Sequence, residues 1–197
     1  DSLYLSLTNY SMKQNYRFVG LDNYAKIFTD DTASTVLKNT LIFTLCSVPL
    51  LIIIPVFLAC ALNQKIHGVR FFRAVYFVPT MISMVATGII WQWMFNAEFG
   101  IINYFLSLIG VKGPAWIGAN GILSPISFSM VCAWSSMGFY MSLWQAGLKS
   151  IPADVLEASS LDGCTGTSQI FRIILPMLRE NVTSICIFVL TAALKIY

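Results

Sequence analysis

Four long apolar stretches separated by polar breaks dominate the hydrophobic pattern of this chain. They cover approximately residues 36–62, 71–95, 122–148 and 182–197. A helix needs about 20 mainly apolar residues to cross a hydrocarbon layer roughly 30 Å thick. The pattern therefore predicts an all-α fold: a polytopic membrane helical bundle of about four transmembrane helices, with short helices in the segments between them.

The first two predicted spans contain prolines, and tryptophans mark the end of the second. Pro49 and Pro55 lie in the first and Pro79 in the second. Membrane helices tolerate proline because neighbouring helices and side chains satisfy the freed carbonyl groups. Trp91 and Trp93 close the second span, and tryptophan is enriched at the level of the lipid headgroups. The two tryptophans therefore mark the point where this span leaves the membrane.

The remaining segments predict a division of the chain into two domains. Residues 1–35 are too polar to span and are expected to form an extracytoplasmic arm, followed by a transmembrane domain over residues 36–197. Within that domain, residues 98–121 form a connector. Its residues 101–109 can make a short helix at the membrane surface before a turn-rich segment. Residues 149–181 form a second, more polar connector.

Positive charge in the short connections predicts the orientation of the spans, because Lys and Arg are retained on the cytoplasmic side. Residues 64–73 carry three such charges, at Lys65, Arg70 and Arg73, whereas the connector 98–121 carries only Lys112. Residues 64–73 and 149–181 are therefore predicted to be cytoplasmic. Four positive residues near the arm, Lys13, Arg17, Lys26 and Lys38, oppose this orientation in part, although four aspartates accompany them.

Composition favours lipid as the solvent. Hydrophobic residues make up 57% of the 197 residues and charged residues 11%, whereas soluble domains carry about 25% charged residues. The net charge of +3 is not gathered into a basic surface, which argues against nucleic acid as a partner. The cysteines show no C-x-x-C spacing and mostly lie in apolar stretches, so neither a metal site nor a disulfide is predicted. They are Cys46, Cys60, Cys132, Cys164 and Cys186.

Known catalytic patterns are absent from the sequence. The single histidine, His67, lies in a predicted cytoplasmic connection, and there is no G-x-S-x-G, H-E-x-x-H or P-loop motif. The chain is therefore predicted not to be an enzyme, to have no catalytic residues and not to hydrolyse ATP itself. The first three spans hold no deeply placed Asp, Glu, Lys or Arg, which argues against a proton relay or an ion-coupled pump.

The connector 149–181 has the pattern of two short helices joined at a glycine. Ser150 can cap the first helix, Pro152 suits its first turn, and Gly163 can take the left-handed conformation that ends a helix. The second helix has an apolar face at helical spacing, and Pro176 is predicted to bend the chain into the fourth span. The residues of that face are Phe171, Ile174, Leu175 and Leu178. Such a pair of short helices can transmit force to another subunit. Alternatively, it can be an ordinary amphipathic loop.

The same connector resembles the EAA loop of binding-protein-dependent ABC transporter permeases. Residues 157–163 read Glu-Ala-Ser-Ser-Leu-Asp-Gly, and Gln-Ile-Phe and Ile-Leu-Pro follow at 169–171 and 174–176. Ser159 and Cys164 stand where alanine is usual in that motif. In both cases one small residue replaces another. Likeness to the carbohydrate-uptake branch of that family extends over most of the chain, through residues 18–24, 38–40 and 70–73 and Pro79.

This resemblance implies the permease subunit of an ATP-driven importer, which forms the path for a sugar or sugar derivative in the bacterial plasma (inner) membrane as a multi-pass protein. The implied partners are ABC ATPase subunits, a second permease subunit, an extracytoplasmic solute-binding protein and membrane lipid. No cofactor is expected on this chain, because the partner hydrolyses the ATP. One membrane helix is expected before Asp1 and at least one after Tyr197.

The resemblance assigns coupling to the ATPase to the loop residues Glu157, Ala158, Asp162, Gly163, Leu175 and Pro176. Polar side chains in the spans are candidates for the sugar path, although such groups also bond their own or neighbouring helices. They are Ser83, Thr87, Gln92, Ser135, Ser136, Tyr140 and Gln145, of which Gln92, Ser135 and Tyr140 are the selected candidates. The spans alone would also allow a secondary transporter or channel that is not driven by ATP.

Overall fold

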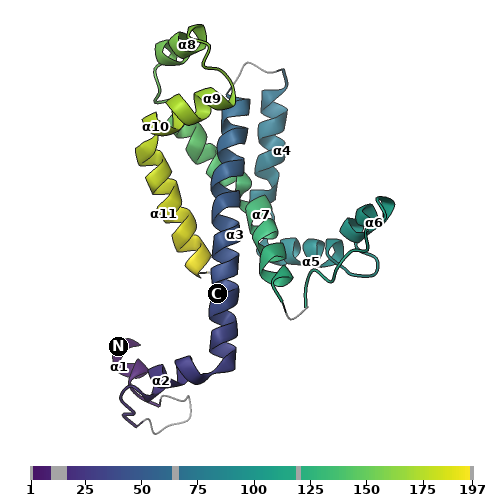
Figure 1. Ribbon diagram of the computed structural model, residues 1–197, viewed down its shortest axis with the longest axis vertical. Helices are drawn as coiled ribbons and strands as arrows, with labels where there is room; N and C mark the ends of the chain where they lie inside the picture. Colours follow the sequence, from purple (N-terminus) through teal and green to yellow (C-terminus); the bar gives the residue numbers. More distant parts are fainter. Residues whose placement is uncertain (1, 10–16, 64–66, 119–120, 196–197) are drawn as a thin grey trace. The chain divides into compact units, whose positions relative to one another are not determined.

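The computed structural model describes residues 2–9, 17–63, 67–118 and 121–195 (Figure 1). In these residues the secondary structure is helical, and extended backbone pairs only in an isolated antiparallel bridge between Thr8 and Phe18. The all-α class predicted from the hydrophobic pattern is confirmed. The chain divides into two compact units, residues 1–41 and 42–197, and helix α3 (Asp31–Leu62) contributes to both.

The first unit contains α1 (Ser2–Ser6), α2 (Asp22–Thr29) and the first turns of α3. Asn23, near the start of α2, donates from Nδ2 to the carbonyl groups of Ser6 and Thr8, each at 2.9 Å. Asp30 accepts the Thr32 N–H at 2.8 Å and so satisfies a free donor at the start of α3. Helix α3 begins five residues before the first predicted span, and the extracytoplasmic arm at residues 1–35 stays a prediction. Lys13 lies outside the described residues.

The second unit is built around α7 (Leu123–Leu148), whose Trp144 is fully buried. Trp144 belongs to one buried cluster with apolar residues of α3 and of α11 (Arg179–Lys195), among them Ala59 and Val189. Ser129 of α7 donates its hydroxyl to the carbonyl group of Phe43 in α3 at 3.2 Å. The core of this unit therefore joins helices that are far apart in the sequence.

Gly138 brings α7 close to α4 (Val69–Met81). A Cβ atom at this position would lie 2.7 Å from the Tyr76 carbonyl oxygen and 2.8 Å from the Phe77 Cα. Small residues at helix contacts let two backbones approach closely, which is how many membrane helices pack. The contact between α4 and α7 thus depends on the missing side chain of one glycine.

Among the described helices, α3 alone has the length and apolar character of a continuous membrane span. Two helix pairs qualify when a bend is allowed: α4 with α5 (Met84–Met94), bent by 101°, and residues 167–177 with α11, bent by 86°. The length of α7 is sufficient, but its six serines lower its hydropathy. The described residues thus contain one continuous candidate span, or up to three if each bent pair is one span, against the four that the hydrophobic pattern predicts.

The stretch 71–95, read from the sequence as one span, is broken between α4 and α5. Pro79 cannot donate a backbone hydrogen bond in the last turn of α4, and Ile82 and Ser83 have extended backbone. The Ser83 hydroxyl then accepts the Ala86 N–H at 3.3 Å, which starts a new helix. In the following connector, the helix predicted at 101–109 is present as α6 (Ile101–Leu108).

Candidate functional site

Helix α8 (Ala153–Leu161) carries Glu157 and Ala158, and Asp162 and Gly163 follow directly at its C-terminal end. The helix is largely open to solvent. Glu157, Ala158 and Asp162 are exposed, and the Leu161 side chain is 89% exposed. Figure 1 shows α8 at the same end of the second unit as the end of α3 and the start of α4. An apolar side chain so fully exposed beside two carboxylates gives this helix end a surface of mixed chemistry.

Gly163 follows the C-terminal end of α8 and takes the left-handed backbone conformation for which glycine is the usual residue. Its φ angle is +78°, its N–H bonds the Ser160 carbonyl group at 3.1 Å, and the Cys164 N–H bonds the Ser159 carbonyl group at 2.9 Å. These two bonds form a Schellman motif, in which a left-handed residue satisfies the last carbonyl groups of a helix. A Cβ atom at Gly163 would have nothing within 4 Å, so the chain itself leaves this position open.

The start of α8 differs from the prediction in its capping. The Ser150 hydroxyl donates back to the Gly147 carbonyl group at 2.7 Å instead of capping α8, and Pro152 occupies the N-cap position rather than the first turn. The prediction that Ser150 caps this helix was wrong, because the preceding helix α7 offers its hydroxyl a nearer acceptor. Asp154 does lie in the first turn, where a negative charge is favourable.

After Gly163 the chain forms α9 (Thr167–Gln169), a π-helical segment η1 (Ile170–Ile174) and α10 (Leu175–Met177). Of the predicted coupling residues here, Leu175 is half-buried and Pro176 is exposed. The buried face consists of Ile170, Ile174 and Leu178, whereas Phe171 is 60% exposed. Phe171 lies at the edge of this face, where its ring centroid is 6.1 Å from that of Phe57 on α3. The Leu175 N–H bonds the carbonyl group of Ile170, five residues back, and this wider turn rotates the face.

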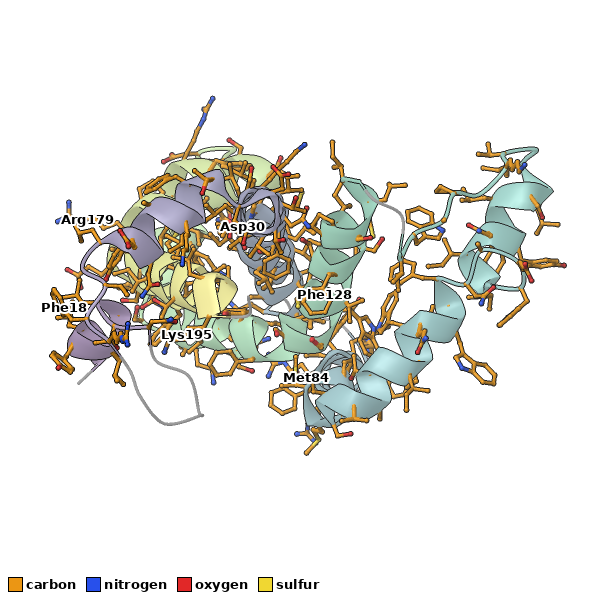
Figure 2. The ribbon with its side chains drawn as sticks, turned by 90° about the horizontal axis from the view of Figure 1, so that it is seen from below. Phe18, Asp30, Met84, Phe128, Arg179 and Lys195 are labelled. Carbon is orange, nitrogen blue, oxygen red and sulfur yellow. The ribbon has the colours of Figure 1, made fainter. Side chains whose placement is uncertain are left out.

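A cavity of about 330 Å³ lies within the second unit and is lined by residues of α3, α4, α5, α7 and α11. Ser135 and Tyr140 line it, together with Ser136 and Thr87. Figure 2 labels two further lining residues, Phe128 on α7 and Met84 at the start of α5. Gln92, by contrast, is exposed on α5 and is not among the lining residues. The structure thus brings two of the three selected path candidates together.

Ser47 of α3 is a lining residue that sequence reasoning missed. It is fully buried, and its hydroxyl has no hydrogen-bond partner among the described residues. A serine in an apolar stretch is expected to bond its own helix backbone, so the sequence offers no signal for this position. The wall of the cavity therefore holds a buried hydroxyl group whose hydrogen-bonding capacity the described residues do not use.

The second unit combines three features of a membrane permease domain. It has apolar helices of membrane length, a partly polar cavity between them and an exposed helical loop at one end. A search with protein-family models gives no match. Three curated relatives are a xylose/arabinose import permease of Haloferax volcanii, a multiple sugar-binding transport system permease of Streptococcus mutans and a diacetylchitobiose uptake system permease of Streptomyces coelicolor. They are 33%, 29% and 30% identical over 93%, 98% and 93% of this chain. The chain spans 57%, 67% and 55% of their lengths.

Two solved structures share the fold. One is a bacterial ABC transporter involved in the import of the acidic polysaccharide alginate, with a TM-score of 0.80, 21% identity, and coverage of 98% of this chain and 66% of the matched chain. The other is a bacterial alginate ABC transporter in complex with an alginate pentasaccharide-bound periplasmic protein, with a TM-score of 0.77, 22% identity, and coverage of 89% and 62%. The chain is thus similar over nearly its whole length to permease proteins of ABC transporters.

Proposed function

We propose that this chain is part of the permease subunit of an ATP-driven importer and forms part of the path for a sugar or sugar derivative. It crosses the bacterial inner membrane four times, through α3, the bent pair α4–α5, α7 and α11. The import functions in the names of the relatives support this proposal. The observation that carries it is the exposed helix α8, which presents charged and apolar groups that the chain itself does not cover.

In this proposal α8 is the contact with a separate ATPase. Glu157 and Asp162 provide hydrogen-bond acceptors, Ala158 and Leu161 provide apolar contact, and the open turn at Gly163 permits close approach. Leu175 and Pro176 connect this contact to α11. ATP binding changes the conformation of the permease only if the ATP-bound ATPase binds α8 with a different free energy in the two conformations of the permease. ATP hydrolysis belongs to the partner, and this chain needs no cofactor or catalytic residue.

The positive residues near α8 support a cytoplasmic location for it. Lys149 precedes the helix, and Arg172 and Arg179 follow it. At the same end of the unit, Arg73 of α4 donates from Nη2 to the Leu62 carbonyl group at the end of α3, at 3.0 Å. A guanidinium group at a helix C-terminus is favourable, and basic residues mark the cytoplasmic side. Lys65, which supports the same orientation, lies outside the described residues.

The cavity serves as part of the sugar path in this proposal. Its volume of about 330 Å³ falls in the range of roughly 300–1,000 Å³ that is usual for small-molecule sites. Hydroxyl groups of Ser47, Ser135 and Tyr140 provide donors and acceptors, and apolar side chains fill the remaining walls. A second permease subunit completes the path, and an extracytoplasmic solute-binding protein delivers the sugar from the side opposite α8.

Cysteine crosslinking in the assembled full-length transporter tests the proposal. With the native cysteines replaced, Leu161→Cys should crosslink to the ATPase subunit, and a membrane-impermeant maleimide should not label it in intact cells. Tyr104→Cys, an exposed position on α6, is the matched control and should show the reverse. Labelling of Leu161→Cys from outside, or the absence of any crosslink to the ATPase, would contradict the proposed function.

A further inference from the structure

Gln169, at the end of α9, is hydrogen-bonded to α8 through three acceptors. Its side-chain Nε2 donates to Ser159 Oγ at 2.7 Å, to the Leu156 carbonyl oxygen at 3.1 Å and to Ser160 Oγ at 3.3 Å. Ser159 is buried and Gln169 is half-buried, so this contact is partly shielded from water. The three bonds cross from one helix to another and connect α8 with the segment that leads to α11.

This network uses a donor at position 169. Ser159 and Ser160 each donate their hydroxyl hydrogen to the Leu156 carbonyl oxygen, at 2.9 and 2.8 Å, and so present oxygen lone pairs to Gln169. The two hydrogens of the glutamine amide are shared among these two hydroxyl oxygens and the Leu156 carbonyl oxygen. A carboxylate of the same shape would fit only if the serine hydroxyls rotated away from Leu156, which breaks their present bonds.

Few other contacts hold α8 to the bundle. Ser159 is the one buried residue of this nine-residue helix. A cavity of about 380 Å³, lined by Leu156, Gln169, Ile170, Phe57 and Leu148 among others, occupies the space where a packed helix would have apolar neighbours. Isolated helices shorter than about 12 residues are marginal in water. Leu156, half-buried against the core cluster, is the apolar anchor of α8. Loss of the bonds to Gln169 would therefore make local opening of α8 more frequent.

We propose that Gln169 is a positioning residue that locks α8 to α9 and η1, so that a displacement of α8 is passed on to the bundle. The residues that follow Gln169 continue this connection, because Ile170 and Ile174 are buried in the same cluster as Val189 of α11. The inference deepens the proposed function and rests on it: α8 receives the force from the ATPase, and Gln169 transmits it across the cavity.

Hydrogen exchange on the assembled full-length transporter tests the lock directly. Gln169→Glu keeps the shape of the side chain and removes the donor, so amide exchange in residues 153–164 should rise about two- to tenfold, the range that a net hydrogen bond corresponds to. Gln169→Lys restores a donor and should return exchange toward that of the unmodified protein. Thr165→Glu adds the same charge to an exposed position outside the network and should change nothing.

A second measurement tests whether a displacement of α8 reaches α11. A non-hydrolysable ATP analogue is added, and amide hydrogen exchange is followed in residues 179–195. The unmodified transporter should show a nucleotide-dependent change in these residues, and Gln169→Glu should lose most of it while Leu161→Cys still crosslinks to the ATPase. If Gln169→Glu does not assemble, Ser159→Ala combined with Ser160→Ala removes both hydroxyl acceptors and carries the same prediction. Unchanged exchange in these variants would overturn the lock alone, whereas a missing crosslink would overturn the docking of α8.

Discussion

Trp116 donates from its indole Nε1 to the side-chain oxygen of Asn103 at 2.7 Å. The same asparagine donates from Nδ2 to the carbonyl groups of Ala97 and Pro114, at 3.1 and 3.2 Å. Asn103 is the buried residue of this short helix, whose other side chains are exposed or half-buried. Its side chain therefore joins the beginning, the middle and the end of the connector between α5 and α7.

Replacement of Asn103 by alanine should open this connector. The change leaves the Ala97 and Pro114 carbonyl groups and the Trp116 indole N–H without this partner. A typical hydrogen bond contributes about 0.5–1.5 kcal/mol to stability, so the loss of three favours local opening. Limited proteolysis should cut residues 98–118 at least about tenfold faster, because cleavage follows local opening. Ser107→Ala, which removes only a bond to the carbonyl group of Tyr104 on the same helix, is the control. Equal protection in both variants would show that Asn103 does not hold the connector.

A side chain at Gly138 should separate α4 from α7. The Tyr76 carbonyl oxygen and the Phe77 Cα occupy the space that a Cβ atom needs. Gly138→Leu should therefore lower the apparent stability in detergent by about 1–3 kcal/mol, the usual cost of overpacking, as measured by thermal unfolding. Gly88→Leu on α5 meets nothing within 4 Å at its Cβ and should unfold at nearly the same temperature as the unmodified protein. A Gly138→Leu protein with unchanged unfolding would contradict this close contact.

The elements that the sequence predicted well are those whose cause is local. The apolar length of α3, the periodicity of α6 and the glycine after α8 each act over one helix or one turn. The break near Ser83 was missed because Met81, Ile82 and Met84 read as a continuous apolar run. Its signal was present in Pro79 and in a serine able to cap the next helix.

The residues that the sequence could not place depend on distant partners. Asn103, Gln169 and Ser47 are polar side chains whose burial is decided by segments elsewhere in the chain. The burial of Ile170 was missed for a different reason. A regular 3.6-residue period does not include the π turn from Ile170 to Ile174, which sets which side chains of this segment face the core.

Filling the cavity should reduce uptake without preventing assembly. Ser135→Leu places a larger apolar side chain among the lining residues and removes a hydroxyl group. Uptake measured with a panel of radiolabelled sugars should fall about tenfold or more for any sugar that the unmodified transporter imports, since binding groups and space are both lost. Gln92→Leu, an exposed position away from the lining, should retain uptake. The opposite ranking of the two variants would exclude this cavity as the sugar path.

A bulky residue at Gly163 should uncouple the permease from its ATPase while the chain still folds, and Gly110 provides a close control. Both glycines end a helix in the same turn: φ is +78° at Gly163 and +76° at Gly110, and at either position a Cβ atom would meet nothing within 4 Å. In the Gly110 turn, the Gly110 N–H bonds the Ser107 carbonyl group at 3.0 Å and the Val111 N–H bonds that of Leu106 at 2.9 Å. Leucine at either position therefore carries the same left-handed strain, about 1–2 kcal/mol.

The amount of permease in the membrane should fall equally in the two leucine variants, whereas uptake and co-purification of the ATPase should be lost only with Gly163→Leu. Gly163→Asn, which tolerates this backbone conformation and is smaller, should retain part of both. Normal uptake by Gly163→Leu, or an equal loss with Gly110→Leu, would show that the turn after α8 does not contact the ATPase.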